Sequence, residues 1–95
     1  MRDALIAALD EYNENELDYL NGAGGDSPAT DYPTPEDLAA AATERSEQFR
    51  EIAAFLVRLD ASSGSVGMAE AAAQGWGDLA ANPQTKPRFP LEVAR

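Results

Sequence analysis

Acidic side chains follow one another at helical spacing in the N-terminal part of the chain. Residues 9–20, LDEYNENELDYL, contain five carboxylates and no base. Glu11, Glu14 and Asp18 are three and four residues apart, so a helix would place them on one face. Carboxylate oxygens are ligands that Mg²⁺ prefers, and the same charges would attract a basic protein surface. The chemistry open to this stretch is therefore metal binding or electrostatic recognition.

A second set of carboxylates, Glu44, Glu47 and Glu51, repeats this spacing. Two such sets facing each other would form an all-carboxylate Mg²⁺ site, and the spacing resembles motifs of the helical pyrophosphohydrolases of the MazG type. Both sets, however, lie opposite the apolar faces of their predicted helices. If the two sets faced each other, those apolar faces would be exposed to water, and the free energy lost would exceed what binding one ion contributes. We expect solvated acidic faces without metal or cofactor, and keep a Mg²⁺-dependent hydrolase as a remote alternative.

Other catalytic chemistry has few residues available. The chain contains no histidine and no cysteine, which removes the commonest general base, the commonest zinc ligands and any disulfide. Its serines lack a histidine base and a G-x-S-x-G turn, and no complete phosphate-binding loop is present. We therefore predict a protein that is not an enzyme.

The net charge of −10 is unevenly distributed. Residues 1–37 carry ten acids against Arg2 alone, whereas residues 61–95 are neutral. Such a chain repels nucleic acid and anionic membranes and is attracted to basic surfaces. The apolar run at residues 4–9 is too short for a signal sequence or a membrane span, so we expect a cytoplasmic protein. A halophilic or high-GC background would also explain the acidity, since the chain has one lysine against six arginines.

Hydrophobic periodicity predicts three helices, over residues 3–20, 34–60 and 66–81. Thr34 and Pro35 are typical of a helix start, and Asn21-Gly22 of a helix end. The second helix has an apolar seam at spacings of four and three: Leu38, Ala42, Arg45, Phe49, Ile52, Leu56 and Leu59. The segment between the first two helices, rich in Gly and Pro, is expected to be a linker.

Polar residues also occur on the predicted apolar faces. Glu16 lies in the apolar stripe of the first helix and Arg45 in the middle of the seam, at similar heights in an antiparallel hairpin. We predict that they form a buried ion pair that fixes the register; alternatively, Arg45 faces another subunit. Trp76, between two glycines, is either a core residue or an apolar anchor for a protein interface.

The C-terminal segment is punctuated by Pro87 and Pro90, which favour an extended arm. Phe89, Leu91 and Val93 alternate along it, as in a peptide that buries one face. We expect the arm to contact either its own helices or a neighbouring molecule, and favour the neighbour or another protein partner.

Together these features predict an all-α domain at residues 1–82, an antiparallel hairpin of the first two helices plus a short third one, with an arm at 83–95. Nineteen alanines leave little bulky core, which favours a homo-oligomer or a docked state. We expect an adaptor or inhibitor that binds a basic protein surface, and nucleic-acid mimicry, as in small phage-encoded antagonists, is the sharpest form of this hypothesis. The alternative is a structural subunit of a symmetric assembly, such as a virus particle, docking through its seam and arm.

Overall fold

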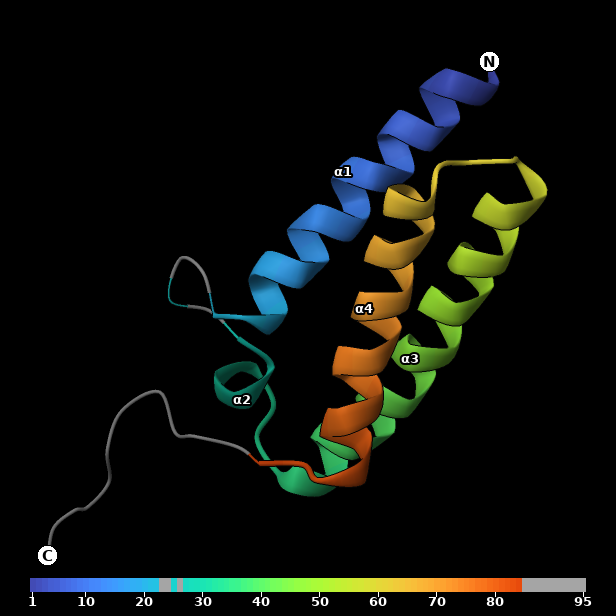
Figure 1. Ribbon diagram of the computed structural model, residues 1–95. Helices are drawn as coiled ribbons and strands as arrows, with labels where there is room; N and C mark the ends of the chain where they lie inside the picture. The colour runs from blue at the N-terminus through green and yellow to red at the C-terminus, as the bar shows by residue number, and fades with distance from the viewer. Residues whose placement is uncertain (23–24, 26, 85–95) are drawn as a thin grey trace, which may run out of the picture.

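The described residues are helical and contain no strand. The computed structural model describes residues 1–22, 25 and 27–84. Its helices are α1 (Arg2–Leu20), α2 (Pro28–Asp31), α3 (Pro35–Arg58) and α4 (Ser63–Ala81), as shown in Figure 1. The all-α prediction is confirmed. The predicted arm residues Phe89, Leu91 and Val93 lie outside the described residues.

Side-chain caps determine where α3 and α4 begin. The Thr34 hydroxyl accepts a hydrogen bond from the Asp37 amide at 3.1 Å, which confirms the predicted start of α3. Ser62 caps α4 by accepting from the Ser65 amide at 3.2 Å. The helix therefore begins at Ser63, three residues before the predicted start, because this cap outweighs the low helix propensity of the glycine that follows.

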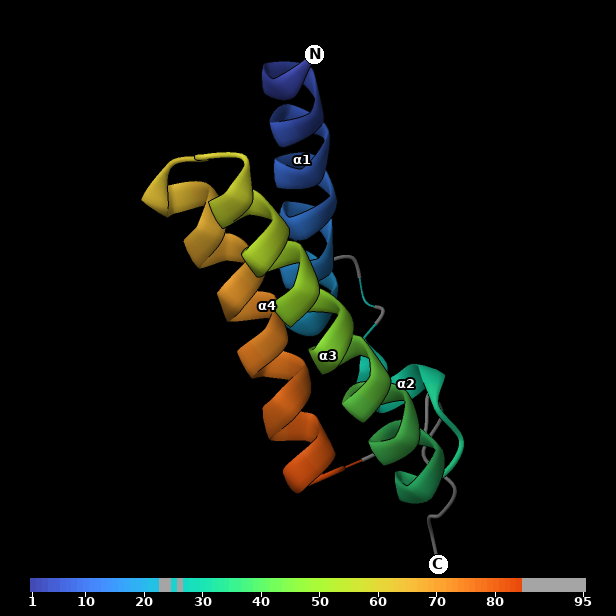
Figure 2. The same cartoon turned by 90° about the vertical axis from the view of Figure 1, so that its right-hand side faces the viewer.

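The antiparallel hairpin consists of α3 and α4, whose contact is the most extensive in the molecule. Only residues 59–62 connect them, and short connections make antiparallel neighbours. The next largest contact joins α1 to α4, and these two helices run in the same direction (Figure 1 and Figure 2). An antiparallel hairpin is thus present, but it does not pair the first predicted helix with the second. The third predicted helix, α4, is not short, because it has 19 residues, as many as α1.

Small side chains allow α4 to pack between its two neighbours. A β-carbon at Gly75 would lie 3.0 Å from a methyl of Leu20 in α1, and one at Gly77 would lie 3.4 Å from the hydroxyl of Ser46 in α3. The two glycines therefore provide close approach on two sides of α4. The buried apolar residues divide into a larger cluster, Leu38, Ala42, Phe49, Ala72, Ala73 and Trp76, and a smaller one, Ala53, Leu56 and Ala69.

A single helical turn, α2, interrupts the segment that was predicted to be a linker. At its start the Ser27 amide donates to the Thr30 hydroxyl at 3.2 Å and that hydroxyl donates to the Ser27 carbonyl oxygen at 3.0 Å, and Pro28 is buried. The Tyr19 hydroxyl of α1 donates a 2.8 Å hydrogen bond to the Asp31 carboxylate. This contact attaches α2 to the C-terminal end of α1.

Candidate functional site

The three carboxylates at helical spacing on α1 form an exposed acidic face, defined by Glu11, Glu14 and Asp18. The opposite side of α1 contains the fully buried Asn13, so the acidic face points away from the packed side of the helix. The one base of α1 is Arg2, whose guanidinium contacts Asp3 at 3.1 Å and the Leu59 carbonyl oxygen at 2.9 Å. The acidic face therefore has no counter-charge within its own helix.

Polar contacts hold α1 in place from one end to the other. Near the N-terminal end of α4, the Ser65 hydroxyl donates to the Asp10 carboxylate at 3.0 Å. About three helical turns further along α4, the Trp76 indole N–H donates to Glu16 at 2.5 Å. Both acceptors lie on the packed side of α1. The acidic face is thus presented by a helix whose rotation about its own axis is fixed.

Glu16, Arg45 and Trp76 bring all three long helices together, and we call them the Trp76 cluster. An Arg45 guanidinium nitrogen lies 3.8 Å from the Glu16 oxygen that accepts from the indole. The guanidinium carbon lies 5.4 Å from the centre of the Trp76 ring, within cation–π distance. Glu16 thus interacts with a neutral donor and a cation at the same oxygen.

The structure places Glu16 next to Arg45, but the pair is not fully buried. The Glu16 side chain is 12% exposed, whereas that of Arg45 is 39% exposed. The contact is also a single one at 3.8 Å instead of a bidentate pair, because the indole N–H already holds the carboxylate. Trp76 is the member of the cluster that the sequence analysis missed. A buried indole N–H requires a hydrogen-bond acceptor. The sequence feature that could have indicated this acceptor is the carboxylate of Glu16 within the apolar stripe of the first helix.

Trp76 itself is fully buried in the core of its own molecule. Of the two roles predicted for Trp76, a core residue and an apolar anchor for a protein interface, this burial favours the core residue. Its ring packs against that of Tyr19, with 6.1 Å between the ring centres and a tilt of 40°. Trp76 contributes packing and a hydrogen bond, and offers no surface.

Two groups beside the cluster have shifted pKa values. Burial, and then the hydrogen bond to Asp31, raises the pKa of Tyr19 above its ordinary value. Burial alone would lower the pKa of Arg45, but hydrogen bonding to the Tyr32 side chain and attraction to Glu16 raise it on balance. Both shifts favour the protonated forms, so the tyrosine stays neutral and the arginine stays charged.

Asn13 is the least satisfied polar residue of the described chain. It is fully buried, and neither its side-chain oxygen nor its nitrogen has a hydrogen-bond partner there. One oxygen of Asp10, a turn away, is also buried without a partner. Desolvation of these polar atoms without hydrogen bonds therefore lowers the stability of the fold at two neighbouring positions on the packed side of α1.

The second set of carboxylates, Glu44, Glu47 and Glu51, is exposed on α3. Across residues 1–22, 25 and 27–84, no three acidic side chains converge as metal ligands would.

No family model, curated protein or solved structure matches the chain. No helix in the described ranges combines the length and the apolar character needed to cross a membrane.

Proposed function

We propose that the protein is a non-enzymatic interaction module whose acidic face binds a basic surface on a protein partner. The observation that carries this proposal is the position of Glu11, Glu14 and Asp18. They are exposed together on the unpacked side of α1, without a base among them. In this role the protein acts as an adaptor or as an inhibitor that competes for the basic surface, with nucleic-acid mimicry as one form of inhibition.

The charge of α3 provides the contrast that supports this choice. Its exposed acids Glu44, Glu47 and Glu51 share the helix with Arg45, Arg50 and Arg58, so local attraction to a basic partner is partly cancelled. On α1, the single base is already occupied at the N-terminal end. A basic partner approaching by electrostatic steering would therefore meet α1 first.

The proposal is tested with two triple variants of equal net charge. One is Glu11→Gln, Glu14→Gln, Asp18→Asn, and the other is Glu44→Gln, Glu47→Gln, Glu51→Gln. The probe is a fluorescently labelled lysine-rich peptide, titrated at two salt concentrations. We expect the α1 variant to lose about tenfold or more in affinity and the α3 variant only about two- to threefold.

Equal losses in the two variants would mean that the peptide senses net charge alone. The acidity would then serve solubility, and the proposed interaction face would be abandoned. Far-ultraviolet circular dichroism of both variants checks that the helices are retained, which is expected because all six residues are exposed.

The alternative of a structural subunit receives less support. Its docking surface was the apolar seam of α3, and Leu38, Ala42, Phe49 and Leu56 of that seam are buried in the molecule's own core. A neighbouring copy would find these residues already covered. That alternative now depends on the arm at residues 83–95.

A further inference from the structure

Only one residue of α1 is buried, and it is polar. Within Arg2–Leu20, all of which the structure describes, that residue is Asn13. The apolar residues on the packed side of α1 remain partly exposed: Ile6, Leu9, Leu17 and Leu20. The buried apolar residues of the described chain all belong to α3 and α4: Leu38, Ala42, Phe49, Ala53, Leu56, Ala69, Ala72, Ala73 and Trp76. The α3–α4 hairpin therefore contains the core, and α1 covers one side of it.

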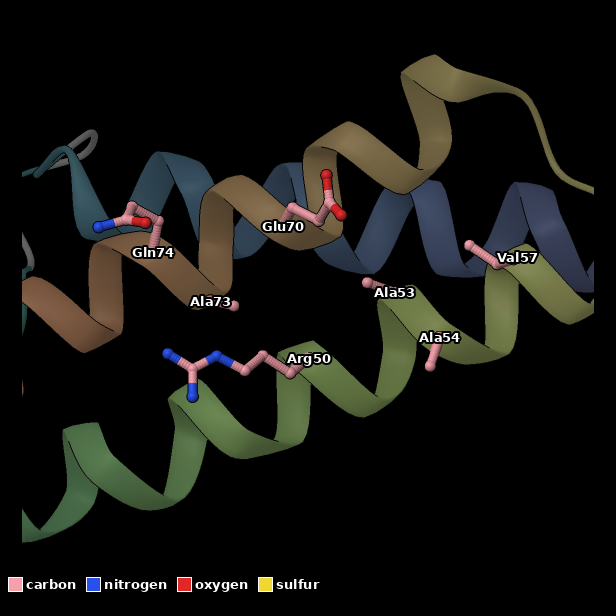
Figure 3. A pocket seen from close by; sticks show the side chains of 7 residues that line it. All are labelled: Arg50, Ala53, Ala54, Val57, Glu70, Ala73 and Gln74. Atoms are coloured by element: carbon pink, nitrogen blue, oxygen red, sulfur yellow. The ribbon is translucent and has the colours of Figure 1, made fainter.

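The α3–α4 hairpin is closed by contacts of its own. The buried Ser46 hydroxyl of α3 donates a 2.9 Å hydrogen bond to the Ala73 carbonyl oxygen of α4. Gly77 allows close approach of α4 to the same serine. On the side away from α1, both helices line a hollow of about 540 Å³, where Ala53 and Ala73 lie across from each other (Figure 3). No helix of the described chain covers this hollow, so α3 and α4 pair without support from that side.

The polar contacts that fix the orientation of α1 contribute little to the free energy of its docking. The hydrogen bonds from Ser65 to Asp10 and from Trp76 to Glu16 replace bonds that these groups make to water when α1 is away. The amide of Asn13 and one oxygen of Asp10 are buried without a partner, and both would regain water. Desolvation of these groups therefore opposes the docking of α1.

Electrostatic repulsion also opposes the docking of α1. Residues 2–20 carry six acids and one base, and residues 35–81 carry eight acids and three bases, so each part has a net charge of −5. Parts of like charge repel each other. One ion pair of the described residues connects the two parts, that of Arg45 with Glu16, and its length is 3.8 Å.

We propose that α1 opens from the α3–α4 hairpin as a unit while the hairpin stays folded, and that α1 is thereby a movable cover over Trp76. Regions with few buried apolar contacts open at a lower free energy than the core of the same protein. Opening frees the indole N–H from Glu16 and the ring from Tyr19. The docking of α1 thus decides whether the one tryptophan of the sequence is buried or accessible. This inference concerns the packed side of α1 and does not depend on the acidic face.

Two buried serines allow the opening to be measured in the full chain, which contains no cysteine. Ser65 is 5% exposed and contacts Asp10 of α1, whereas Ser46 is 4% exposed and lies between α3 and α4. The variants Ser65→Cys and Ser46→Cys are labelled separately with iodoacetamide, a neutral reagent, at urea concentrations below the unfolding transition. When labelling is slow relative to closing, its rate follows the equilibrium population in which the thiol is exposed.

We expect the logarithm of the labelling rate at position 65 to rise with urea at about half the slope found at position 46, or less. The reason is that opening of α1 exposes less surface than unfolding of the hairpin, and the urea dependence scales with the surface exposed. Equal slopes at the two positions would show that α1 and the hairpin open together, which overturns the proposal.

A second comparison separates opening of α1 from fraying of the first turn of α4, which contains Ser65. Asn13→Leu, added to Ser65→Cys, replaces the unpaired amide by an apolar side chain and should slow labelling about tenfold. The control Asn15→Leu, at an exposed position of the same helix, should change the rate by less than about twofold. The intrinsic reactivity of the thiol cancels in this comparison. An unchanged rate in Asn13→Leu would mean that the turn of α4 exposes the thiol by itself, and the proposal would fail.

Discussion

At the scale of single residues, polar side chains on apolar faces were the most informative part of the sequence. Glu16 and Arg45 interrupt apolar patterns on different helices, and such residues predict an internal partner. The structure brings them within 3.8 Å of each other. Trp76 could not be assigned to the pair beforehand, because a buried indole is compatible with any acceptor and the sequence does not show which side of α4 meets α1.

Asn13 yields a prediction about stability. Asn13→Leu should raise the free energy of unfolding by about 1–2 kcal/mol, because it removes a fully buried amide whose two polar atoms lack partners. Urea denaturation measures the change. Asn15→Leu, at an exposed position two residues away, is the matched control and should change stability by less than about 0.5 kcal/mol. A loss of stability in Asn13→Leu would show that the amide is satisfied, for instance by a buried water.

At the scale of elements, the three long helices followed from local chemistry, whereas the short α2 and the start of α4 at Ser63 did not. Thr34 and Pro35 marked the start of α3 within the sequence, and the end of α1 at Leu20 agrees with the Asn21-Gly22 signal. Helix pairing did not follow, because it depends on which apolar faces fit together at a distance. The short connection at residues 59–62 could have predicted the pairing of α3 with α4, because helices joined by four residues pack as antiparallel neighbours.

The glycines of α4 separate helix propensity from packing. Gly67→Ala should stabilise the protein by about 1 kcal/mol, because no atom lies within 4 Å of the added β-carbon. Gly75→Ala has the same gain in propensity, but its β-carbon would meet Leu20 at 3.0 Å, so its net effect should be clearly smaller or unfavourable. Thermal melting of the two variants compares them directly. Equal stabilisation would mean that α1 can move away from α4 without cost.

At the scale of the whole molecule, the net charge of −10 destabilises the folded state through repulsion among its acids. The described ion pairs, Arg2 with Asp3 and Arg45 with Glu16, compensate only a small part of this charge. Composition predicted this property fully, because it does not depend on which helices pair.

Salt should therefore stabilise the protein in a non-specific way. The melting temperature in magnesium chloride should match that in sodium chloride at equal ionic strength, because both act by screening. Differential scanning fluorimetry is sufficient for the comparison. An upward shift at micromolar Mn²⁺ that disappears in Glu11→Gln or Glu47→Gln would contradict this expectation and support the carboxylate metal site.

The contact between α1 and α4 also has a consequence for the order of synthesis. The residues that cover α1, such as Ser65 and Trp76, follow it by 55 and 60 positions. At roughly 5–20 residues per second, a nascent α1 waits several seconds for its partner helix. A lone helix of 19 residues is only marginally stable, and its apolar side chains face water during this interval. The dense negative charge of α1 would keep neighbouring nascent chains apart until α4 emerges.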